Sequence, residues 1–384
     1  MVRSHRLRIV FFIQGEGRGH MTQALALKRI LDEAGHEVAG VFMGENPHRP
    51  VPEFFARALD APLHTYPAPF FVLDGKGKGV RPVSSAFRAV ASAPAYWAEG
   101  PRAHATIMGY DPHLLVNFYD LLGGLYYSLY RPAIPLVAVG HQFLFFHPGL
   151  PLPPGRGWEV AGARLHTMTT APGAALRLAL SFSPMPDRPG HRLRVVPPLL
   201  RKAVLEREPS PGRHVLAYVL NPGYGEELAR WHADHPEWEI HCFWDKKDAP
   251  PTLTPRPGFT FHRLDDRAFL DYLASARGYV STAGFESVCE AAYLGKPVMI
   301  VPTGNHVEQL CNALDAERAG IARWRESFDL SPFVTHLEEG SAGGHPWFRR
   351  WVRTAPEIFL RLLEATARGE DPMRTSLPET SPDE

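Results

Sequence analysis

The sequence predicts an α/β protein made of two doubly wound domains that face each other across a cleft. Three observations lead to this prediction. Apolar strand-like runs alternate with amphipathic helical segments in the first half of the chain, the alternation restarts in the second half, and a proline-rich stretch separates the two series. The 384 residues suit two domains of ordinary size.

The first half opens with a strand, a glycine-rich turn, a helix and a second strand. Residues 8–13 form a continuous apolar run, which indicates a buried parallel strand. Residues 24–34 repeat apolar side chains at helical spacing, and Gly35 stands where a helix C-cap is expected. Residues 37–43 have the pattern of the next strand, so the opening is a βαβ unit.

Further strands continue this alternation in both halves. We predict them at residues 113–118, 134–139, 192–196, 215–220, 238–244, 259–263, 278–281 and 297–301. The predicted organisation is an N-terminal Rossmann-like domain over 1–198, a linker over 199–212, a C-terminal Rossmann-like domain over 213–345, a C-terminal helix over 346–368 that packs back on the N-terminal domain, and a disordered tail over 369–384.

Composition narrows the class of partner. Lys plus Arg is 41 and Asp plus Glu is 41, so net charge gives no reason to expect nucleic acid as a partner. The three cysteines form no CxxC pair, which indicates buried thiols in a reducing compartment. The apolar run near the N-terminus is too short for a signal peptide, so we expect a cytoplasmic protein that is able to contact a membrane surface.

A strand–turn–helix segment over residues 281–297 carries the main functional prediction. Gly284 lies in the turn that opens the helix, and a helix N-terminus offers unpaired N–H groups and a positive dipole end to a pyrophosphate. Ser287 adds a hydroxyl group, and the Glu290 carboxylate suits ribose hydroxyls. Farther on, Glu308 and Gln309 carry the acceptor and donor groups that bind the hydroxyls of a sugar.

These positions resemble the donor-binding signature of UDP-glycosyltransferases and of the peptidoglycan N-acetylglucosaminyltransferase that makes lipid II. The matching positions are Gly284-Phe285, Ser287, Glu290, Gly295, Pro297, Pro302, Glu308-Gln309 and Asn312-Ala313. The resemblance implies the GT-B fold, with two Rossmann-like domains across a cleft, and a nucleotide-sugar donor, which we expect to be a UDP-sugar.

The resemblance also implies roles for individual residues. It assigns Gly284 and Ser287 to the phosphates, Glu290 to the ribose, and Glu308 with Gln309 to the sugar. The complete set of expected donor-binding residues is Arg263, Leu264, Thr282, Ala283, Gly284, Phe285, Ser287, Glu290, Glu308, Gln309 and Asn312. The chain departs from the plant-type signature at Thr282, where that signature has His, and at Glu286, where it has Asn. A carboxylate at 286 would repel a pyrophosphate unless it points away.

The glycine-rich loop of the first half supplies the candidate base. Gly15, Gly17 and Gly19 precede His20 in a GxGxG pattern, which is not the GxGxxG dinucleotide fingerprint. The loop resembles the glycine-rich loop ending in His of the same glycosyltransferases. An imidazole suits the removal of a proton from an attacking hydroxyl, so we predict His20 as the catalytic base.

A carboxylate beside His20 would fix its tautomer, and Asp120, just after a predicted strand, is the first candidate for this partner. Asn117 and Glu16 are further candidates. His141 and Gln142 follow another strand and either bind acceptor or form a turn.

The aromatic stretches 69–72 and 143–146 either pack in the core or, where exposed, receive a lipid-linked acceptor or rest on a bilayer.

The first functional prediction is an inverting glycosyltransferase whose N-terminal domain binds a hydroxyl acceptor, with lipid-linked and cell-envelope acceptors included. No Asp-x-Asp motif occurs, so we expect neither a metal nor another cofactor to be required. The alternatives are a nucleotide-sugar epimerase of the same fold and a non-catalytic sugar-nucleotide-binding protein. The absent dinucleotide fingerprint disfavours an NAD-dependent oxidoreductase. The acceptor and the oligomeric state stay open.

Overall fold

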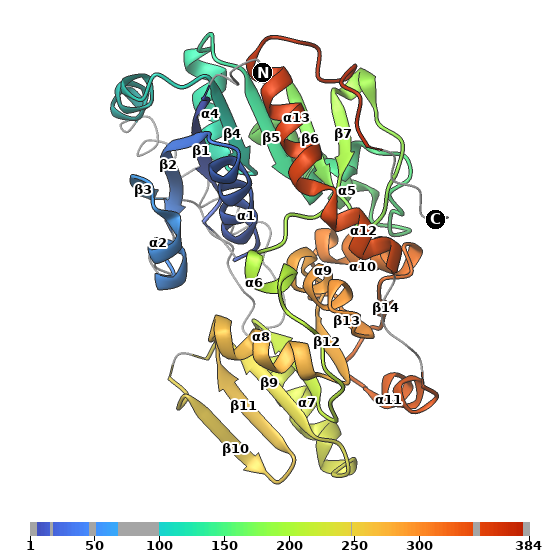
Figure 1. Ribbon diagram of the computed structural model, residues 1–384. Coiled ribbons are helices and arrows are strands. Elements are labelled where there is room, and N and C mark those ends of the chain that lie inside the picture. The colour runs from blue at the N-terminus through green and yellow to red at the C-terminus, as the bar shows by residue number, and fades with distance from the viewer. Residues whose placement is uncertain are drawn as a thin grey trace.

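The computed structural model describes residues 6–15, 18–45, 51–67, 100–246, 248–340 and 346–378. Within these ranges it confirms the predicted fold class: two mainly parallel sheets, each covered by helices, lie one above the other in Figure 1. We call the bodies built on the first and second sheets the N-terminal and C-terminal domains. The residue bounds given above for the domains stay a prediction.

The N-terminal sheet is wholly parallel in the described residues, with the order β3-β2-β1-β4-β5-β6-β7. Its strands are β1 (Arg8–Ile13), β2 (Glu37–Glu45), β3 (Leu63–Pro67), β4 (Leu114–Phe118), β5 (Leu136–Gly140), β6 (Leu176–Leu180) and β7 (Leu193–Val196). The order reverses beside β1, between β1 and β4. Ligands of doubly wound sheets bind at the carboxyl ends of the strands at such a point.

Helices cover the faces of this sheet. They are α1 (Gly19–Glu33), α2 (Glu53–Leu59), a helical segment over residues 100–109, α4 (Leu121–Tyr130), the 3-10 helix η1 (His141–Phe146), α5 (Gly157–Thr170) and the 3-10 helix η2 (Pro189–His191). Helix α1 begins at the carboxyl end of β1 and buries Ala24, Leu27 and Leu31 against the core, as helical spacing of its apolar residues requires.

The C-terminal sheet has the order β10-β11-β9-β8-β12-β13-β14. Its strands are β8 (Val215–Val219), β9 (Ile240–Trp244), β10 (Thr252–Arg256), β11 (Phe259–Arg263), β12 (Gly278–Thr282), β13 (Val298–Val301) and β14 (Arg323–Trp324). Only β10 is antiparallel to its neighbour within the described ranges. The helices of this domain are α7 (Pro222–Asp234), α8 (Asp266–Ser275), α9 (Phe285–Tyr293), α10 (Val307–Arg318) and α11 (Ser331–Glu338).

Three further helices connect the two domains. The short helix α6 (Lys202–Leu205) lies within the predicted linker. The sequence predicts one helix over 346–368, but the structure has two, α12 (Pro346–Arg353) and α13 (Ala355–Ala367). Pro356 explains the break, because a proline lacks the N–H that a continuous helix would need. Helix α13 packs on α1 and β4 of the N-terminal domain (Figure 1).

The start of the predicted disordered tail is ordered. Arg194 of β7 is 6% exposed, and its guanidinium donates hydrogen bonds to the carbonyl oxygens of Met373 (3.3 Å) and Thr375 (2.6 Å). A buried guanidinium needs such acceptors, which holds residues 369–378 beside the sheet. Residues 379–384 lie outside the described ranges.

The two domains meet at the carboxyl ends of their strands. Helix α1 packs on α9, and α5 packs on α10, so each domain contributes helices to the junction. One hydrophobic cluster runs through both domains and includes Leu27 of α1, Val288 of α9 and Phe359 of α13. The ends of β1, β4, β5 and β12 are thereby brought to one region.

Candidate active site

His20 lies in the first turn of α1, at the junction of the domains. Its side chain is 9% exposed, and its ring stacks on that of Tyr119 with 5.7 Å between centroids. Its Nδ1 lies 3.3 Å from Oε1 of Gln23. Burial lowers the pKa of His20 below its usual 6.5, while the Glu308 carboxylate opposes this shift. The imidazole is therefore neutral at neutral pH, as a general base must be.

The amino end of α9 lies directly beside α1, the helix that carries His20. Nε2 of Gln23 donates a hydrogen bond to Oε1 of Glu286, and the two atoms are 2.5 Å apart. A side chain added at Gly19 would lie 3.2 Å from Cγ of Glu286, so only a glycine lets the helices come this close without adjustment. The predicted donor helix and the predicted base thus belong to one site.

Glu286 does not point away from this site. Burial raises the pKa of its carboxyl to about 8, and nearby Glu290 raises it further, against the hydrogen bond from Gln23 and the charge of Arg201. Its Oε2 is buried and has no hydrogen-bond partner among the described residues. The site therefore contains a carboxyl group that takes up a proton easily.

Asp120 has a different role from the one predicted. It is the N-cap of α4, and its Oδ1 accepts the N–H of Gly123 at 2.8 Å, so the predicted pair with His20 is not formed in this structure. Burial raises the pKa of Asp120 to about 6 despite that bond. Asn117 is also engaged, because its amide donates to the carbonyl oxygens of Asp120 and Thr170. Glu16 lies outside the described residues.

Glu290, expected at the ribose, is paired with an arginine of the linker. Arg201 donates from Nε to Oε1 (2.6 Å) and from Nη2 to Oε2 (2.9 Å), and Glu290 is 2% exposed. Arg201 also lies 3.5 Å from Asp266, which in turn accepts from Arg18 at 3.3 Å. A ribose must share or displace this ion pair to reach Glu290.

The residues expected at the sugar are also engaged. Oε1 of Glu308 accepts from Nε2 of Gln142 (3.1 Å), and that nitrogen lies 3.5 Å from Nε2 of His20. Gln309 uses its Oε1 to accept the N–H of Thr303 at 2.8 Å.

Asn312 donates to the carbonyl oxygen of Ala283 at 3.1 Å. Glu308 is therefore linked to His20 through Gln142, whereas the side chains of Gln309 and Asn312 hold loops of the C-terminal domain.

His141 joins the domains instead of lying open to an acceptor. It is 4% exposed, its Nδ1 donates to the carbonyl oxygen of Leu180 (2.8 Å), and its ring stacks on Phe285 at 4.1 Å. Phe182 packs on the same phenylalanine at 4.7 Å. Since Phe285 is the first residue of α9, these rings fix α9 against the N-terminal domain.

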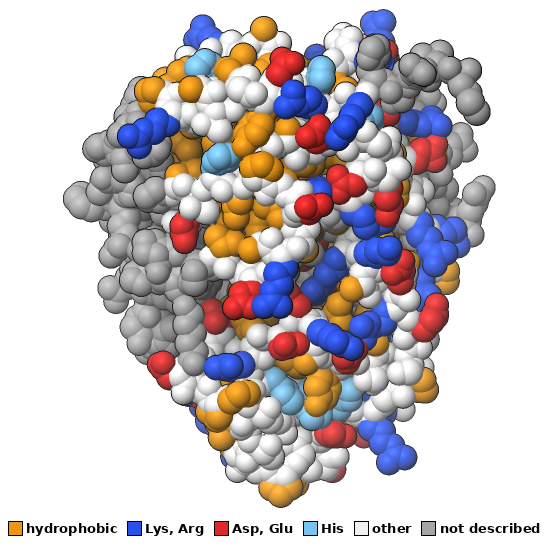
Figure 2. Space-filling model, turned by 60° about the vertical axis from the view of Figure 1, so that its left-hand side comes forward, with side chains coloured by type: hydrophobic (Ala, Val, Ile, Leu, Met, Phe, Trp, Pro, Cys, Tyr) orange, Lys and Arg blue, Asp and Glu red, His pale blue; other side chains and the backbone are white. Residues whose placement is uncertain are grey.

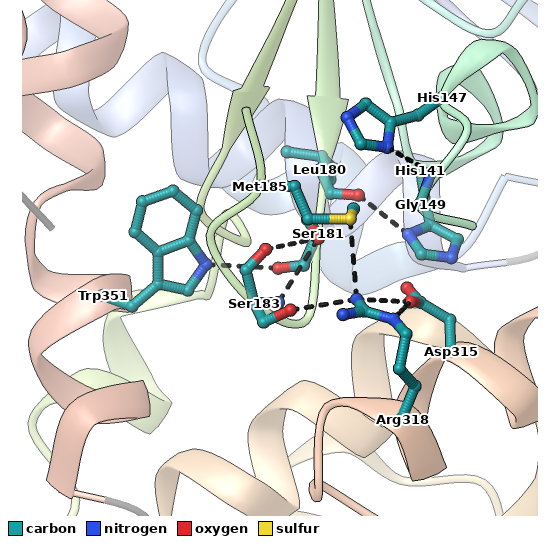
Figure 3. A network of polar contacts seen from close by, with 10 residues as sticks. All are labelled: His141, His147, Gly149, Leu180, Ser181, Ser183, Met185, Asp315, Arg318 and Trp351. Carbon is teal, nitrogen blue, oxygen red and sulfur yellow. Dashed lines mark hydrogen bonds and ion pairs between the residues drawn. The ribbon is translucent and has the colours of Figure 1, made fainter. Parts of the chain in front are cut away.

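A polar network continues this junction (Figure 3). Arg318 of α10 pairs with Asp315 at 2.7 Å and donates to Oγ of Ser183, which follows β6, at 3.0 Å. Figure 3 also shows Trp351 of α12 donating to the carbonyl oxygen of Ser181, at 3.3 Å. Helices α10 and α12 thereby both bind the loop after β6.

The start of α9 is open where a ligand is expected. Gly284 is its N-cap without a side-chain cap, and a Cβ added there would meet no atom within 4 Å. Ser287 is half-buried in the first turn, while Thr282 and Ala283 are buried at the end of β12. The orphan N–H groups of this helix end are the groups that bind phosphate elsewhere.

The remaining predicted residues lie at the edges of this site. Arg263 ends β11 and is exposed, and Leu264 packs partly on the core. Gly15 has no room for a side chain, because a Cβ would lie 1.5 Å from the carbonyl oxygen of Gly44. Gly17 lies outside the described residues.

Three contacting residues did not emerge from the sequence. Gln23 had a signal, since it follows His20 by one helical turn and shares its face. No sequence pattern indicated Arg201, which lies in the proline-rich linker, or Tyr119, which follows a strand. The Tyr119 backbone is left-handed, with φ of 59°. Such strain in a residue other than glycine is frequent at functional sites.

The chain matches one protein-family model, that of glycosyl transferase family 1, over residues 7–337. No curated protein sequence matches it.

Solved structures resemble it over nearly its whole length. The glycosyltransferase of kitacinnamycin has a TM-score of 0.61 at 17% identity and covers 94% of this chain and 100% of its own. A UGT transferase from Siraitia grosvenorii in complex with UDP has a TM-score of 0.56 at 14% identity, with 95% and 98% covered.

MurG from Acinetobacter baumannii has a TM-score of 0.53 at 15% identity, with 93% and 99% covered. At such identities the likeness shows the fold, which is GT-B, whereas the family model covers most of the chain. The chain therefore belongs to glycosyl transferase family 1 and is a glycosyltransferase with two Rossmann-like domains.

Proposed function

We propose that this glycosyltransferase moves a sugar, with inversion at the anomeric carbon, from a UDP-sugar to a hydroxyl group of its acceptor. The observation that carries the proposal is the meeting of two features from opposite domains. The first turn of α9 and the first turn of α1, which bears His20, are joined through Glu286 and Gln23.

The donor part of the proposal rests on the open amino end of α9. The space beside Gly284 and the uncapped N–H groups suit the diphosphate, with Ser287 close to it and Glu290 on the ribose side. We propose that Arg263 and Leu264, at and just after the end of β11, contact the nucleobase. A similar fold has been solved with UDP, which supports uridine as the nucleoside. Because helix dipole and backbone meet the phosphate charge, we propose that transfer needs no metal and no other cofactor.

The inversion rests on the base. A single displacement needs one group that removes a proton from the acceptor hydroxyl as it attacks. His20 is buried and neutral, and its Nε2 faces the polar side chains of Gln142 and Glu308. The acceptor hydroxyl would take the place beside Nε2, while Glu308 stabilises the imidazolium that forms.

An apolar surface beside the site supports an apolar, lipid-linked acceptor of the cell envelope. Helix α5 borders the site through His166, whose ring lies 5.4 Å from that of Tyr119. Large apolar side chains are exposed on α4 and α5, namely Leu125, Leu129, Trp158, Leu165 and Met168. By contrast, Phe143, Leu144 and Phe145 are buried, so that stretch is core, and residues 69–72 lie outside the described ranges.

We further propose that the enzyme works in the cytoplasm, in peripheral contact with the inner face of the membrane. Its three cysteines are buried and free, as suits a reducing compartment. None of the described helices is long and apolar enough to span a bilayer. Figure 2 shows basic and acidic side chains interspersed over one face, in keeping with a net charge of +0, and the proposal includes no nucleic acid.

A donor screen tests this function. We expect one or more UDP-sugars to raise the melting temperature, and mass spectrometry of cell extracts incubated with that donor to reveal a product heavier by one sugar. Chelation of metals leaves the yield unchanged. Conversion of the UDP-sugar into its epimer without an acceptor would indicate an epimerase. Donor binding with no product in any extract would indicate a non-catalytic binding protein.

A further inference from the structure

Among the residues that the structure describes, no carboxylate contacts Nδ1 of the predicted base. The first predicted partner, Asp120, caps α4, and the group that Nδ1 contacts is the amide oxygen of Gln23, at 3.3 Å. Gln23 is 3% exposed, and its amide nitrogen donates to Glu286 at 2.5 Å. Gln23 therefore bridges His20 of the N-terminal domain and a carboxyl of the C-terminal domain.

The chemistry of these groups orders the three side chains. Oε1 of Glu286 accepts a hydrogen bond from the NH₂ of Gln23, and it is able to do so both when the carboxyl is ionised and when its proton is on Oε2, which has no partner among the described residues. The amide oxygen then faces His20, and an oxygen accepts a hydrogen bond only from a protonated nitrogen. Nδ1 of His20 must carry the proton, which leaves the lone pair on Nε2.

The surroundings of Nε2 agree with this assignment. The NH₂ of Gln142, which donates to Glu308, is the group that approaches Nε2, at 3.5 Å. An N–H approaches a lone pair and not another N–H. The face of the imidazole stacks on Tyr119, whose hydroxyl forms a hydrogen bond with the hydroxyl of Thr167 at 2.8 Å.

We propose that Gln23 and Glu286 are positioning residues, which hold His20 in the Nδ1–H tautomer so that Nε2 is free to accept the proton of the acceptor hydroxyl. This inference rests on the proposed role of His20 as the base. It also explains why a carboxylate is present at position 286, in the first turn of α9. The Glu286 carboxyl holds Gln23, and Gln23 in turn contacts Nδ1 of His20.

The bridge makes the base depend on the junction of the domains. Gln23 belongs to α1 and Glu286 to α9, so the three side chains are aligned only while these helices are in contact. When the domains separate, Gln23 loses its fixed partner and its amide is free to turn. The base would then be set for catalysis only in the closed enzyme.

The tautomer of His20 is measurable without an acceptor. In protein with ¹⁵N-labelled histidine rings, two-bond ¹H–¹⁵N spectra show which ring nitrogen carries the proton, and the signal lost in His20→Gln identifies His20. The spectra are recorded at pH 9, above the pKa of about 8 to which burial raises Glu286. The expected wild-type result is a single Nδ1–H form.

Two variants break the bridge at different points. In Gln23→Leu no acceptor faces Nδ1, so the Nδ1–H form loses its hydrogen bond and we expect the Nε2–H form to appear beside it. In Glu286→Gln the new amide is able to donate as well as accept, so Gln23 turns and both tautomers appear. The matched control is Glu33→Gln, at an exposed glutamate of α1 that pairs with Arg29; it should keep the wild-type spectrum.

A third variant separates loss of the bridge from loss of structure. The double variant Gln23→Glu/Glu286→Gln exchanges the two groups, so that the carboxylate at position 23 faces Nδ1 of His20 and the amide is at position 286. This exchange should restore the single Nδ1–H form and raise the pKa of His20. Where transfer is measurable, Glu286→Gln should lower kcat by about 10- to 100-fold with little change in donor KM. The double variant should recover much of the lost kcat.

The outcomes distinguish this inference from the proposed function. Retention of one Nδ1–H form in Gln23→Leu or in Glu286→Gln would overturn the bridge, whether or not sugar transfer is found. Failure of the wild-type enzyme to transfer from any UDP-sugar would remove the proposed function, while the spectra would still decide how His20 is held.

Discussion

The environment of His20 determines how the proposed reaction depends on pH. Burial lowers the pKa of His20 from 6.5, whereas an exposed imidazole would begin to protonate near that value. A base is active only when neutral. Transfer should therefore continue undiminished as the pH falls through 6.5 and decline only at lower pH.

Removal of this imidazole tests its role. His20→Ala should lower kcat by about 10²- to 10⁴-fold, the usual contribution of a general base, with the dissociation constant for UDP barely changed. Calorimetry gives the affinity, and a pH series of kcat/KM in the wild type gives the profile. Unaltered turnover in the variant would remove His20 from the mechanism.

The raised pKa of Glu286 predicts how the free energy of unfolding depends on pH. Its pKa is raised from 4.5 to about 8 in the folded protein. Between these pH values the folded state holds a proton that the unfolded state has released, so stability falls as the pH rises. The slope for one such group is about 1.4 kcal/mol per pH unit.

The variant Glu286→Gln has no proton to lose and should lack this decline. Because Glu290 and Arg201 also face the carboxyl, the comparison is made between the two proteins, by urea unfolding at pH 5.5 and pH 7.5. A wild type and a variant with the same change in unfolding free energy between these pH values would show that Glu286 is ionised as usual.

At this scale, local patterns in the sequence predicted candidate residues but not the contacts that those residues make. His20 and the α9 segment followed from a glycine-rich loop and a helix N-terminus, which are local patterns. The engagement of Asp120 as a cap, of Glu290 with Arg201 and of Glu286 with Gln23 depends on which side chains far apart in the chain come together. Local spacing carries no information about such pairs.

At the scale of elements, two glycines have opposite structural roles. Gly15 follows β1 with its Cα against the backbone of β2, where a Cβ would lie 1.5 Å from an oxygen of Gly44. Gly284 opens α9 with an ordinary φ of −75° and open space in front of it. One glycine is required by packing, and the other leaves the space in which we propose that the donor binds.

Replacing each by alanine should separate these roles. Gly15→Ala must push the strands apart and should cost roughly 1–3 kcal/mol of stability. Gly284→Ala should leave the melting temperature nearly unchanged but weaken UDP binding by about tenfold. Thermal unfolding and calorimetry measure the two effects, and unimpaired UDP binding by Gly284→Ala would argue against a phosphate site at this helix end.

The linker is tied to α9 by the Arg201–Glu290 pair. Arg201→Met leaves the Glu290 carboxylate, 2% exposed, without its bidentate partner and should lower the unfolding free energy by about 3–5 kcal/mol. Arg207→Met, at a more exposed pair with Asp271, is the matched control and should cost at most about 1 kcal/mol. If chemical denaturation shows the same loss of unfolding free energy in both variants, the buried Arg201–Glu290 pair stabilises the fold no more than the more exposed pair does.

Elements with strong periodicity were predicted well, and those decided by tertiary contacts were not. The buried strands near residues 8–13 and 297–301 and helix α9 followed from apolar runs and turn residues. Antiparallel β10 is mostly exposed and has no apolar alternation to mark it. The ordered tail over 369–378 depends on Arg194, a buried arginine that nothing in the tail's own polar sequence indicates.

At the scale of the whole molecule, the restart of the strand–helix alternation was enough to predict two sheets. It did not predict that the domains share a hydrophobic cluster, or that Phe285 and Arg318 of the C-terminal domain would bind the loops after β5 and β6. These contacts depend on the relative placement of two bodies, which no single segment encodes. They bring the amino end of α9 close to His20.

The most direct measurement follows the sugar released when water takes the place of the acceptor. With an α-linked UDP-sugar and no acceptor, one-dimensional ¹H NMR resolves the anomeric protons of the released sugar before they equilibrate. An inverting enzyme should release the β-anomer first, and His20→Ala should release almost none. Initial release of the α-anomer, or wild-type release by His20→Ala, would contradict an inverting transfer driven by this histidine.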